Sequence, residues 1–260
     1  PGLDFETKLF AKPDAAVLLS AELQKRTYVV KPIAMGTNTD PYQPIERDWH
    51  ITRQCIEVLA ECRHPLFITT KSDRVLRDID LLSRMAQDGL VAVGISVTTL
   101  DPAVARTLEP RAPHPERRIA AIARLADAGI PVHACVSPII PAITDHEIET
   151  IVGRVAAAGA RSVFWIPVRL PHEVAPLFRA WLDEYYPDRA AKVMNIIRDM
   201  RGGRDNDSRF GNRMRGQGVW AELIRTRFNK ARARAGLDGE RVALRTDLFR
   251  PPAGDQYRLL

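Results

Sequence analysis

Cysteine is scarce in this sequence, which has only Cys55, Cys62 and Cys135 among its 260 residues. Three scattered cysteines cannot form the disulfide framework of a small secreted protein. Cys55 and Cys62 are seven residues apart, which places them two turns along one face of an expected helix and not at a metal-binding spacing. No two histidines have metal-ligand spacing either. We therefore expect no metal site from the residues present, and three small apolar thiols in a reducing compartment.

Long hydrophobic runs are also missing. The longest, such as residues 91–95 and 162–168, are far shorter than the roughly 20 residues that a membrane helix needs. No charged-then-apolar leader opens the chain. Hydrophobic residues make up 45% of the sequence, which is enough for a large core. We expect a soluble cytoplasmic protein with no membrane partner.

Several motifs of common enzymes are absent. The sequence has no P-loop, no GxGxxG, no GxSxG and no HExxH pattern. Nucleotide hydrolysis by a P-loop, dinucleotide binding on a Rossmann fold, the α/β-hydrolase reaction and zincin proteolysis are therefore unsupported.

The sequence does show a regular alternation of strands and helices. Short apolar runs predict five strands, at residues 29–37, 66–72, 91–99, 132–140 and 162–170. Amphipathic segments predict helices between them, at residues 49–62, 74–88, 115–128 and 144–158. Asp101 and Pro102 offer a further helix start, and Thr144 with Glu147 has the spacing of a capping box.

The strands are apolar throughout, which is typical of parallel strands covered on both faces. We predict an α/β fold, with an open or partial barrel slightly favoured over a doubly wound sheet. After residue 170 the alternation stops, and helices are expected at residues 173–185, 188–200 and 219–235. We predict a barrel unit over residues 1–172 and a basic helical extension over 173–260, packed on the barrel.

In parallel α/β folds, ligands bind beyond the carboxyl ends of the strands. Lys71 follows an apolar strand, which favours a pocket lysine that meets a carboxylate or phosphate over a solvated loop lysine. Ser96 lies inside an apolar strand and is equally compatible with a ligand contact or a local backbone bond. Asp101 is expected to be a helix cap, and Asp40 and Glu46 are also compatible with turn formation.

Several segments resemble one known family. They are GTNTDPYQPIE at residues 36–46, ITTKS at 68–72, ISVTTLDPAVARTLEPRAP at 95–113, SPIIPAITDHEIE at 137–149, RLPHEVAPLF at 169–178 and RGGRDNDSRFGNRMRG at 201–216. The chain resembles the radical S-adenosylmethionine (SAM) superfamily, and within it the spore photoproduct lyase-like, or DNA-repair photolyase-like, proteins.

The resemblance implies a partial (β/α)6 TIM-like barrel with a 4Fe–4S cluster. The reduced cluster, fed by a donor such as flavodoxin or ferredoxin, would cleave SAM to a 5′-deoxyadenosyl radical that abstracts hydrogen from a substrate. It also implies a set of SAM-binding residues: Gly36, Thr37, Asn38, Thr39 and Asp40 for the methionine part, Lys71 and Ser96 for the carboxylate and ribose, and Ser137, Pro138 and Ile139 beside the adenine. Substrate contacts are expected from Tyr42, Gln43, Glu46 and Arg169.

Two departures from the family change these expectations. The cluster motif CxxxCxxC is absent, whereas PGLDFETKLFAK at residues 1–12 resembles the stretch that follows it. We therefore expect the first strand and the cluster loop to be missing from this chain, and the chain alone to be inactive. Thr37 occupies the position of the lyase's hydrogen-donating cysteine. A hydroxyl hydrogen is far harder to abstract than a thiol hydrogen, so repair of the spore photoproduct is not expected.

Positive charge is concentrated in one segment. Residues 195–235 hold ten arginines and one lysine against four acids, a local charge of +7, whereas the whole chain carries +6. A one-sided field of this kind attracts phosphates. A nucleic-acid contact surface would use Arg201, Arg204, Arg209, Arg213 and Arg215, with Phe210 available to stack on a base. A solvated, partly ion-paired helical face explains the same residues and is slightly favoured from the sequence.

Three functions are therefore compatible with the sequence. The first is a radical SAM enzyme, with a nucleic acid as one possible substrate. The second is a non-catalytic nucleic-acid-binding protein on a barrel scaffold. The third is an aldolase-like barrel that uses Lys71 to form a Schiff base.

Overall fold

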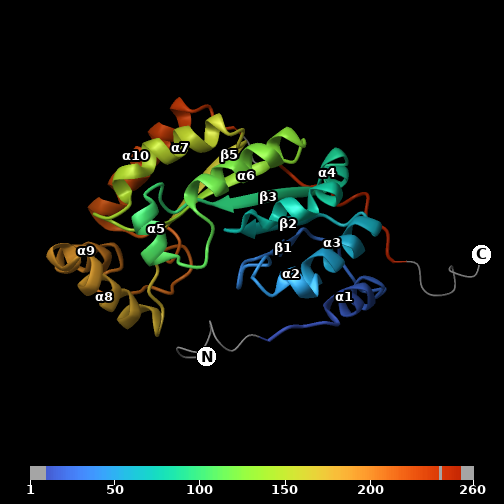
Figure 1. Cartoon of the computed structure of the whole chain (residues 1–260), viewed down its shortest axis with the longest axis horizontal. Coiled ribbons are helices and arrows are strands. Elements are labelled where there is room, and N and C mark those ends of the chain that lie inside the picture. The colour runs from blue at the N-terminus through green and yellow to red at the C-terminus, as the bar shows by residue number, and fades with distance from the viewer. Residues whose placement is uncertain (1–9, 240–241, 253–260) are drawn as a thin grey trace, which may run out of the picture.

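The structure, a computed structural model, describes residues 10–239 and 242–252 and contains a five-stranded parallel sheet (Figure 1). The strands pair in chain order, β1-β2-β3-β4-β5, which is the arrangement of a barrel wall and not of a doubly wound sheet. Their bounds are β1 Ile33–Met35, β2 Leu66–Thr70, β3 Val91–Ser96, β4 Val132–Ile139 and β5 Ser162–Pro167. The α/β class, the five strands and the parallel pairing predicted from the sequence are confirmed.

Helices connect the strands and continue after the sheet. They are α1 Ala15–Leu23, α2 Glu46–Trp49, α3 Ile51–Glu61, α4 Ile79–Gln87, α5 Pro102–Leu108, α6 Pro115–Asp127, α7 Ile148–Ala157, α8 Val174–Tyr185, α9 Pro187–Met200 and α10 Gly218–Arg234, with 3-10 turns η2 Asp73–Asp78 and η3 Asp145–Glu147. The helix α1 has no counterpart among the predictions. Within the described residues, no helix is both long and apolar enough to cross a membrane.

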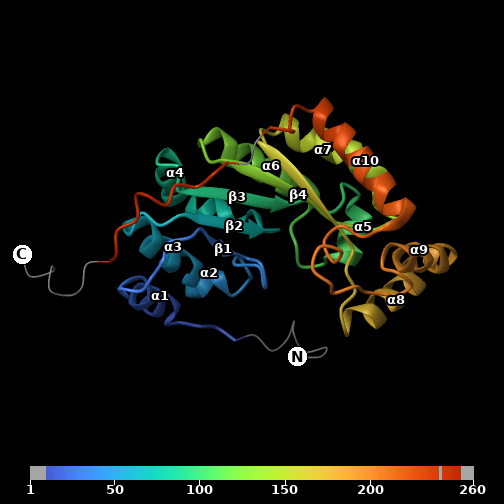
Figure 2. The ribbon, with the colours of Figure 1, turned by 180° about the vertical axis from the view of Figure 1, so that it is seen from behind.

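The two faces of the sheet are covered unequally. The helices α3, α4, α6 and α7 lie on one face, and α10 lies over α7 on the same side (Figures 1 and 2). On the other face, Phe67 of β2 and Phe164 and Ile166 of β5 are only half-buried. These three side chains, with His133 and Ser162, border a cavity of about 750 Å³. The expectation that every strand is covered on both faces is therefore wrong for β2 and β5.

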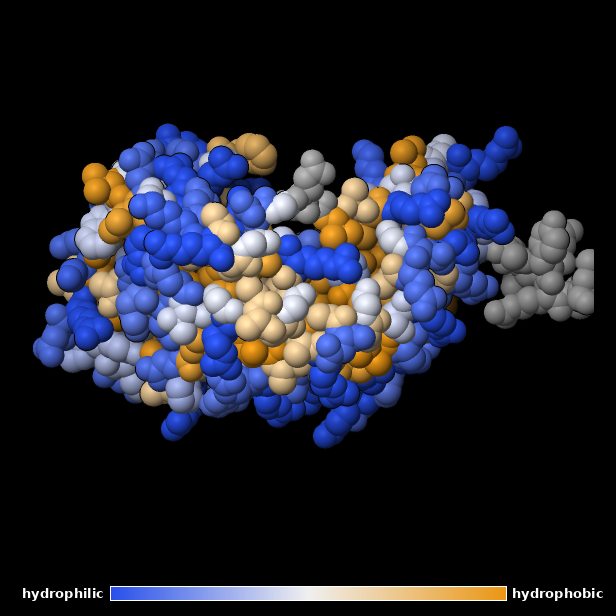
Figure 3. Space-filling view, turned by 90° about the horizontal axis from the view of Figure 1, so that it is seen from above, coloured by the Kyte–Doolittle hydropathy of each residue, from blue (hydrophilic) through white to orange (hydrophobic). Residues whose placement is uncertain are grey.

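The hydrophobic core lies between the sheet and its helices. It includes Ile68, Val93 and Val163 from the strands, and it continues into Phe228 of α10 and Ile196 of α9. Figure 3 views the molecule from above Figure 1, where hydrophilic residues cover much of the surface and hydrophobic ones gather toward the middle. Because the core is shared across residue 172, the boundary proposed there stays a prediction.

The first strand is shorter than predicted for a local reason. Proline has no amide hydrogen to give to a neighbouring strand, so pairing starts after Pro32, where the amide of Ile33 bonds to the carbonyl of Pro65 at 3.0 Å. It stops at Gly36, whose φ of 91° is unfavourable for other residues. A Cβ at Gly36 would lie 2.0 Å from the carbonyl oxygen of Thr69, so the turn after β1 requires glycine.

One predicted helix start is formed differently. Thr144 does not cap α7, because its hydroxyl accepts a bond from the amide of Ile140 at 2.9 Å. Glu147 also turns away, since its carboxylate accepts bonds from the hydroxyl of Thr99 at 2.5 Å and the amide of Leu100 at 2.9 Å. Glu147 therefore holds the loop after β3 and Thr144 the turn after β4, and the capping-box prediction is wrong. Asp101 caps α5 as predicted, with the amide of Ala103 at 2.7 Å.

Candidate functional site

The site lies at the carboxyl ends of β1 to β4, toward which all the strand arrows point (Figure 1). Asp40, in the loop after β1, joins this loop to the end of β2. Its Oδ1 accepts bonds from the hydroxyl of Thr70 at 2.7 Å and the amide of Tyr42 at 2.9 Å, and its Oδ2 accepts one from the amide of Lys71 at 2.8 Å. Asp40 thus fixes the backbone from which the Lys71 side chain starts.

Lys71 faces a buried carboxylate. Its Nζ lies 3.6 Å from Oε1 of Glu109, and 40% of its side chain is exposed, compared with 11% for Glu109. The same carboxylate accepts a 2.9 Å bond from the hydroxyl of Thr98 and lies 2.7 Å from Nη1 of Arg118. Lys71 thus lies in the cleft beside a carboxylate of the chain itself, and its predicted contact with a carboxylate or phosphate of a ligand stays a prediction.

Cys135 of β4 marks the point where three predicted residues converge. Burial raises the pKa of this thiol to about 12, and the neighbouring Ser137, Lys71 and Ser96 offset the rise only in part. Pro138 and Ile139 follow Ser137 directly at the end of the strand. The structure therefore brings Asp40, Lys71, Ser96 and the 137–139 segment, which are remote in the chain, to one edge of the sheet.

A cleft of about 670 Å³ opens beside this edge. Its lining is mostly polar and basic, and includes Asp40, Gln43, Lys71, Arg74, Arg111 and Arg117. Arg117 is held by Asp73, with Nε and Oδ2 2.7 Å apart, and Nη1 of Arg74 donates to the carbonyl of Pro44 at 3.1 Å. The cleft carries more cations than acids, which favours a ligand that brings a carboxylate or phosphate group to it. Thr37, Asn38 and Thr39 are exposed in the adjoining loop.

Two predicted substrate residues instead support the fold. Tyr42 is buried, and its hydroxyl donates to Oδ2 of Asp78 at 2.9 Å. Glu46 is also buried, and its Oε1 accepts bonds from the amide of Thr52 and from Nη2 of Arg77, both at 3.0 Å. Glu46 is therefore not available to a substrate, and that expectation is corrected here. Tyr42 also borders the cleft despite its burial, so its role as a substrate contact stays a prediction.

Arg201 also differs from its prediction. Only 1% of it is exposed, and its guanidinium donates to the carbonyls of Val168, Asn212 and Arg213 at 2.9, 2.9 and 3.1 Å. Burial lowers the pKa of Arg201, and nearby Arg169 adds to this effect. Arg201 is therefore an internal brace and not part of a basic surface.

The other five residues predicted to contact nucleic acid are exposed. Phe210 is 93% exposed at the tip of the loop, with the guanidinium of Arg213 5.6 Å from its ring centre. Arg209 is held by Asp207, with Nη2 and Oδ2 2.8 Å apart. Arg204 and Arg215 are exposed, and Arg169 extends from the end of β5 to within 3.9 Å of the Met214 sulfur.

The chain's own cysteines do not fit an iron–sulfur cluster. All three are buried, and burial raises their pKa values, to about 11 for Cys62 and about 12 for Cys135. A cluster needs thiolates that converge on iron. In the part of the chain that the structure describes, no three His, Cys, Asp or Glu side chains gather as a metal site. No step through a cluster is therefore derived for these residues.

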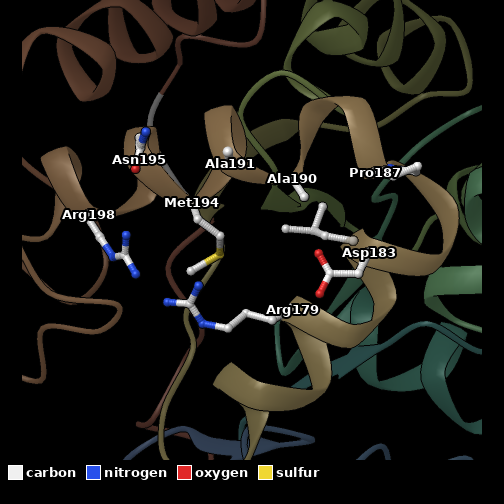
Figure 4. A pocket seen from close by; sticks show the side chains of 9 residues that line it. Arg179, Asp183, Pro187, Ala190, Ala191, Met194, Asn195 and Arg198 are labelled. Atoms are coloured by element: carbon white, nitrogen blue, oxygen red, sulfur yellow. The ribbon is translucent and has the colours of Figure 1, made fainter.

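A second groove, of about 430 Å³, separates α8 from α9. Arg179 and Arg198 point toward each other across it (Figure 4). Both are held by Asp205, at 2.6 and 3.0 Å, and none of the predicted site residues lines the groove. It is thus a separate feature from the strand-end site.

Sequence reasoning missed Glu109, Thr98 and Arg118, which connect the strand ends. Thr98 and Glu109 lie in the 95–113 segment that carried the family resemblance, and the hydroxyl of Thr98 also reaches the carbonyl of Ser137 at 2.9 Å. Arg118 could have been noticed as a charged residue on the apolar face of a predicted helix. Its partners could not, because they are distant in the chain.

The fold and the site together define an α/β protein with an open parallel barrel and a polar, cationic pocket at its strand ends. The chain belongs to the radical SAM superfamily, whose profile matches residues 6–155. This family generally uses SAM and a 4Fe–4S cluster. This chain offers candidate binding residues for the first of these: Lys71 lines the cleft, and Ser96 and Ser137 lie beside Cys135 at the same strand ends.

Relatives are found in bacteria, archaea and phage. An uncharacterized Mycobacterium tuberculosis protein is 33% identical over 200 residues, which is 76% of this chain and 59% of that protein. An uncharacterized Methanocaldococcus jannaschii protein is 31% identical over 174 residues, or 67% of this chain and 64% of its own. A radical SAM Nalpha-GlyT isomerase of Pseudomonas phage M6 is 28% identical over 167 residues, which is 64% of this chain and 34% of the phage protein. The chain thus spans about three fifths of the mycobacterial protein.

Solved structures of spore photoproduct lyase variants have a similar fold. One variant, holding a dinucleoside spore photoproduct, superposes with a TM-score of 0.60 and 16% identity, over 87% of this chain and 65% of the lyase chain. Another variant gives a TM-score of 0.59 with the same identity and coverage. At this identity the similarity concerns the fold alone, and it confirms the predicted barrel architecture.

Proposed function

We propose that this chain forms the SAM-binding barrel of a radical SAM enzyme that acts on a nucleic acid. The observation that carries the cofactor part is the convergence of Lys71, Ser96 and Ser137 around Cys135 at the strand ends. Lys71 would receive the carboxylate of SAM, Ser96 its ribose, and the 137–139 segment its adenine. Gly36 through Asp40 would close over the methionine part.

When bound, SAM supplies a 5′-deoxyadenosyl radical in this family. The residues of this chain have the supporting tasks of binding and orienting it. Asp40 holds the start of the Lys71 side chain, and Gly36 permits the close turn that places residues 37–39 above the strand ends. The electron donor, expected to be a flavodoxin or ferredoxin, stays a prediction.

The loop over residues 201–217 supports the choice of a nucleic acid. Arg201 donates bonds to the carbonyls of Val168 and Asn212, and Asp207 accepts one from the amide of Arg209. These internal bonds organise the loop without a ligand. That organisation leaves Phe210 almost wholly exposed beside Arg213. An exposed aromatic ring among arginines suits stacking on a base with phosphate contacts. The lyase variant of similar fold that holds a dinucleoside photoproduct agrees with this choice.

Calorimetric titration with S-adenosylhomocysteine tests the cofactor site, since this analogue keeps the carboxylate, ribose and adenine. We expect saturable binding that weakens about tenfold in Lys71→Gln. Lys25→Gln is a matched control, because Lys25 lies in an exposed ion pair with Glu22. Absence of binding by the unaltered chain would refute the site.

Binding of single-stranded DNA and RNA at several salt concentrations tests the substrate class. We expect affinity to fall with salt and to drop about tenfold or more in Phe210→Ala, the usual effect of losing one stacked base. Arg225→Ala on α10 is a control, as Arg225 pairs with Glu222 at the surface. An affinity that does not change with salt concentration, or no binding, would instead support a solvated, partly ion-paired helical face.

The other two functions are separated by the same experiments. A non-catalytic scaffold would bind nucleic acid but not S-adenosylhomocysteine. A Schiff-base lysine needs a desolvated or cation-flanked amine, whereas Lys71 is 40% exposed beside a carboxylate. Borohydride trapping of a carbonyl compound on Lys71 would revive the aldolase-like alternative.

A further inference from the structure

Glu109 occupies the centre of the candidate site without having been assigned a role. It ends α5, and its carboxylate lies between two cations, Lys71 on the open side and Arg118 on the buried side. The hydroxyl of Thr98 donates to it as well. One carboxylate thus connects the ends of β2 and β3 with α6.

Arg118 holds this carboxylate firmly. Only 2% of Arg118 is exposed; it forms an ion pair with Glu109 and donates hydrogen bonds to the carbonyls of Pro113 at 2.9 Å and Ser96 at 3.3 Å. A buried guanidinium without its counter-ion is strongly unfavourable. The 2.7 Å contact between Nη1 and Oε2 therefore fixes Glu109 in place whatever Lys71 does.

The contact with Lys71 is looser. The separation is 3.6 Å, close to the limit for an ion pair, and the lysine side chain is substantially exposed. Lys71 can therefore turn toward a ligand while Glu109 keeps both Arg118 and Thr98 as partners. Two cations share one anion, so Lys71 can pair with the carboxylate of a ligand while Arg118 keeps Glu109.

We propose that Glu109 is a positioning residue. It holds Lys71 in the ligand-free protein and releases it to the carboxylate in the amino-acid part of bound SAM. The inference rests on the proposed function, because it takes Lys71 to be the carboxylate ligand of SAM. Glu109 competes with the incoming carboxylate for the same ammonium group. It thereby lowers the affinity for ligands that carry an amino-acid part, and not for the nucleoside part alone.

The test compares two nucleosides by calorimetric titration. S-adenosylhomocysteine has the carboxylate, and 5′-methylthioadenosine lacks the whole amino-acid part. In Glu109→Gln we expect S-adenosylhomocysteine to bind about twofold to fivefold more tightly, the range measured for partly exposed ion pairs. Binding of 5′-methylthioadenosine should stay the same. A role limited to fold support would shift both nucleosides equally.

Matched variants complete the design. Glu149→Gln makes the same charge change in the exposed pair with Arg227 and should alter neither affinity. In a Lys71→Met background, Glu109→Gln should no longer tighten binding. Glu109→Asp keeps a charge for Arg118 while shortening the side chain, and serves if the glutamine variant unfolds; the same tightening, smaller in size, is expected.

The results of these titrations separate the role of Glu109 from the proposed SAM site. If S-adenosylhomocysteine binds but Glu109→Gln and Glu109→Asp leave its affinity unchanged or weaker, the role of Glu109 is overturned and the cofactor site stands. If neither nucleoside binds the unaltered chain, the cofactor site is refuted and the inference falls with it.

Discussion

Oδ2 of Asp40 accepts a hydrogen bond from the backbone amide of Lys71 at 2.8 Å, joining two residues that lie 31 positions apart. The bond ties the loop after β1 to the end of β2. Through it, the position of the Lys71 side chain depends on a residue in another strand-end loop.

Replacement of Asp40 by asparagine is expected to weaken both stability and nucleoside binding. An amide nitrogen facing the Lys71 amide would place two donors together, so the loss should be about 1–3 kcal/mol in the free energy of unfolding. Urea denaturation measures it, and titration with S-adenosylhomocysteine should show weaker binding. Asp48→Asn, in an exposed pair with Arg47, should change neither quantity.

Tyr42→Phe is expected to affect stability alone. The variant removes the hydrogen bond to the buried carboxylate of Asp78, which keeps its two arginine partners, Arg53 and Arg77. We expect a loss of about 1–3 kcal/mol in urea denaturation. The affinities for S-adenosylhomocysteine and for single-stranded DNA should remain within twofold. A large loss of either affinity would support Tyr42 as a ligand contact.

Stability should fall as the solution is acidified below pH 6.5, because of His64. Burial lowers the pKa of His64 below its ordinary value of 6.5, and the bond to the Pro65 carbonyl offsets this only in part. Below pH 6.5 the unfolded chain takes up a proton that the folded chain does not, so unfolding is favoured. Above pH 6.5 both forms are neutral at this residue and the contribution is complete.

Urea denaturation at pH 7.5 and pH 5.5 measures this effect. His64→Gln should be less stable at pH 7.5 but should lose less on acidification than the unaltered chain. An equal loss in both proteins would assign the pH dependence to other groups.

This chain alone is predicted not to cleave SAM. Its three cysteines are buried and lie apart on α3, at its end and on β4, so they cannot together ligate a cluster. After iron and sulfide reconstitution and dithionite reduction, chromatography should detect no 5′-deoxyadenosine above the level without protein. Its formation would contradict the prediction.

The sequence predicted the periodic parts of this fold well. Strands β2 to β5 and helices such as α6 lie close to their predicted positions, because their apolar patterns are long and regular. The local features depended on distant partners and were predicted less well. Thr144 and Glu147 have the spacing of a cap, but Ile140 and Thr99 compete for their side chains.

The candidate site shows the same limit. The strand-end rule identified Asp40, Lys71 and Ser96, since the parallel order brings those positions to one edge. It could not show that Glu46 and Arg201 are buried, because only the folded chain determines which charges find internal partners. For the same reason Glu109 was not singled out, although its residue type and segment were visible.

Residues 242–252 pack near the amino-terminal ends of β2 and β3, opposite the candidate site. The amide of Arg245 bonds to the carbonyl of Gly89 at 3.0 Å, that of Arg250 to the carbonyl of Cys62 at 2.9 Å, and Phe249 packs against His64 and Tyr28. Each of these residues therefore acquires its final neighbour only after more than 150 further positions have been synthesised. The amino-terminal ends of β2 and β3 therefore stay without these contacts until the last part of the chain has folded back onto them.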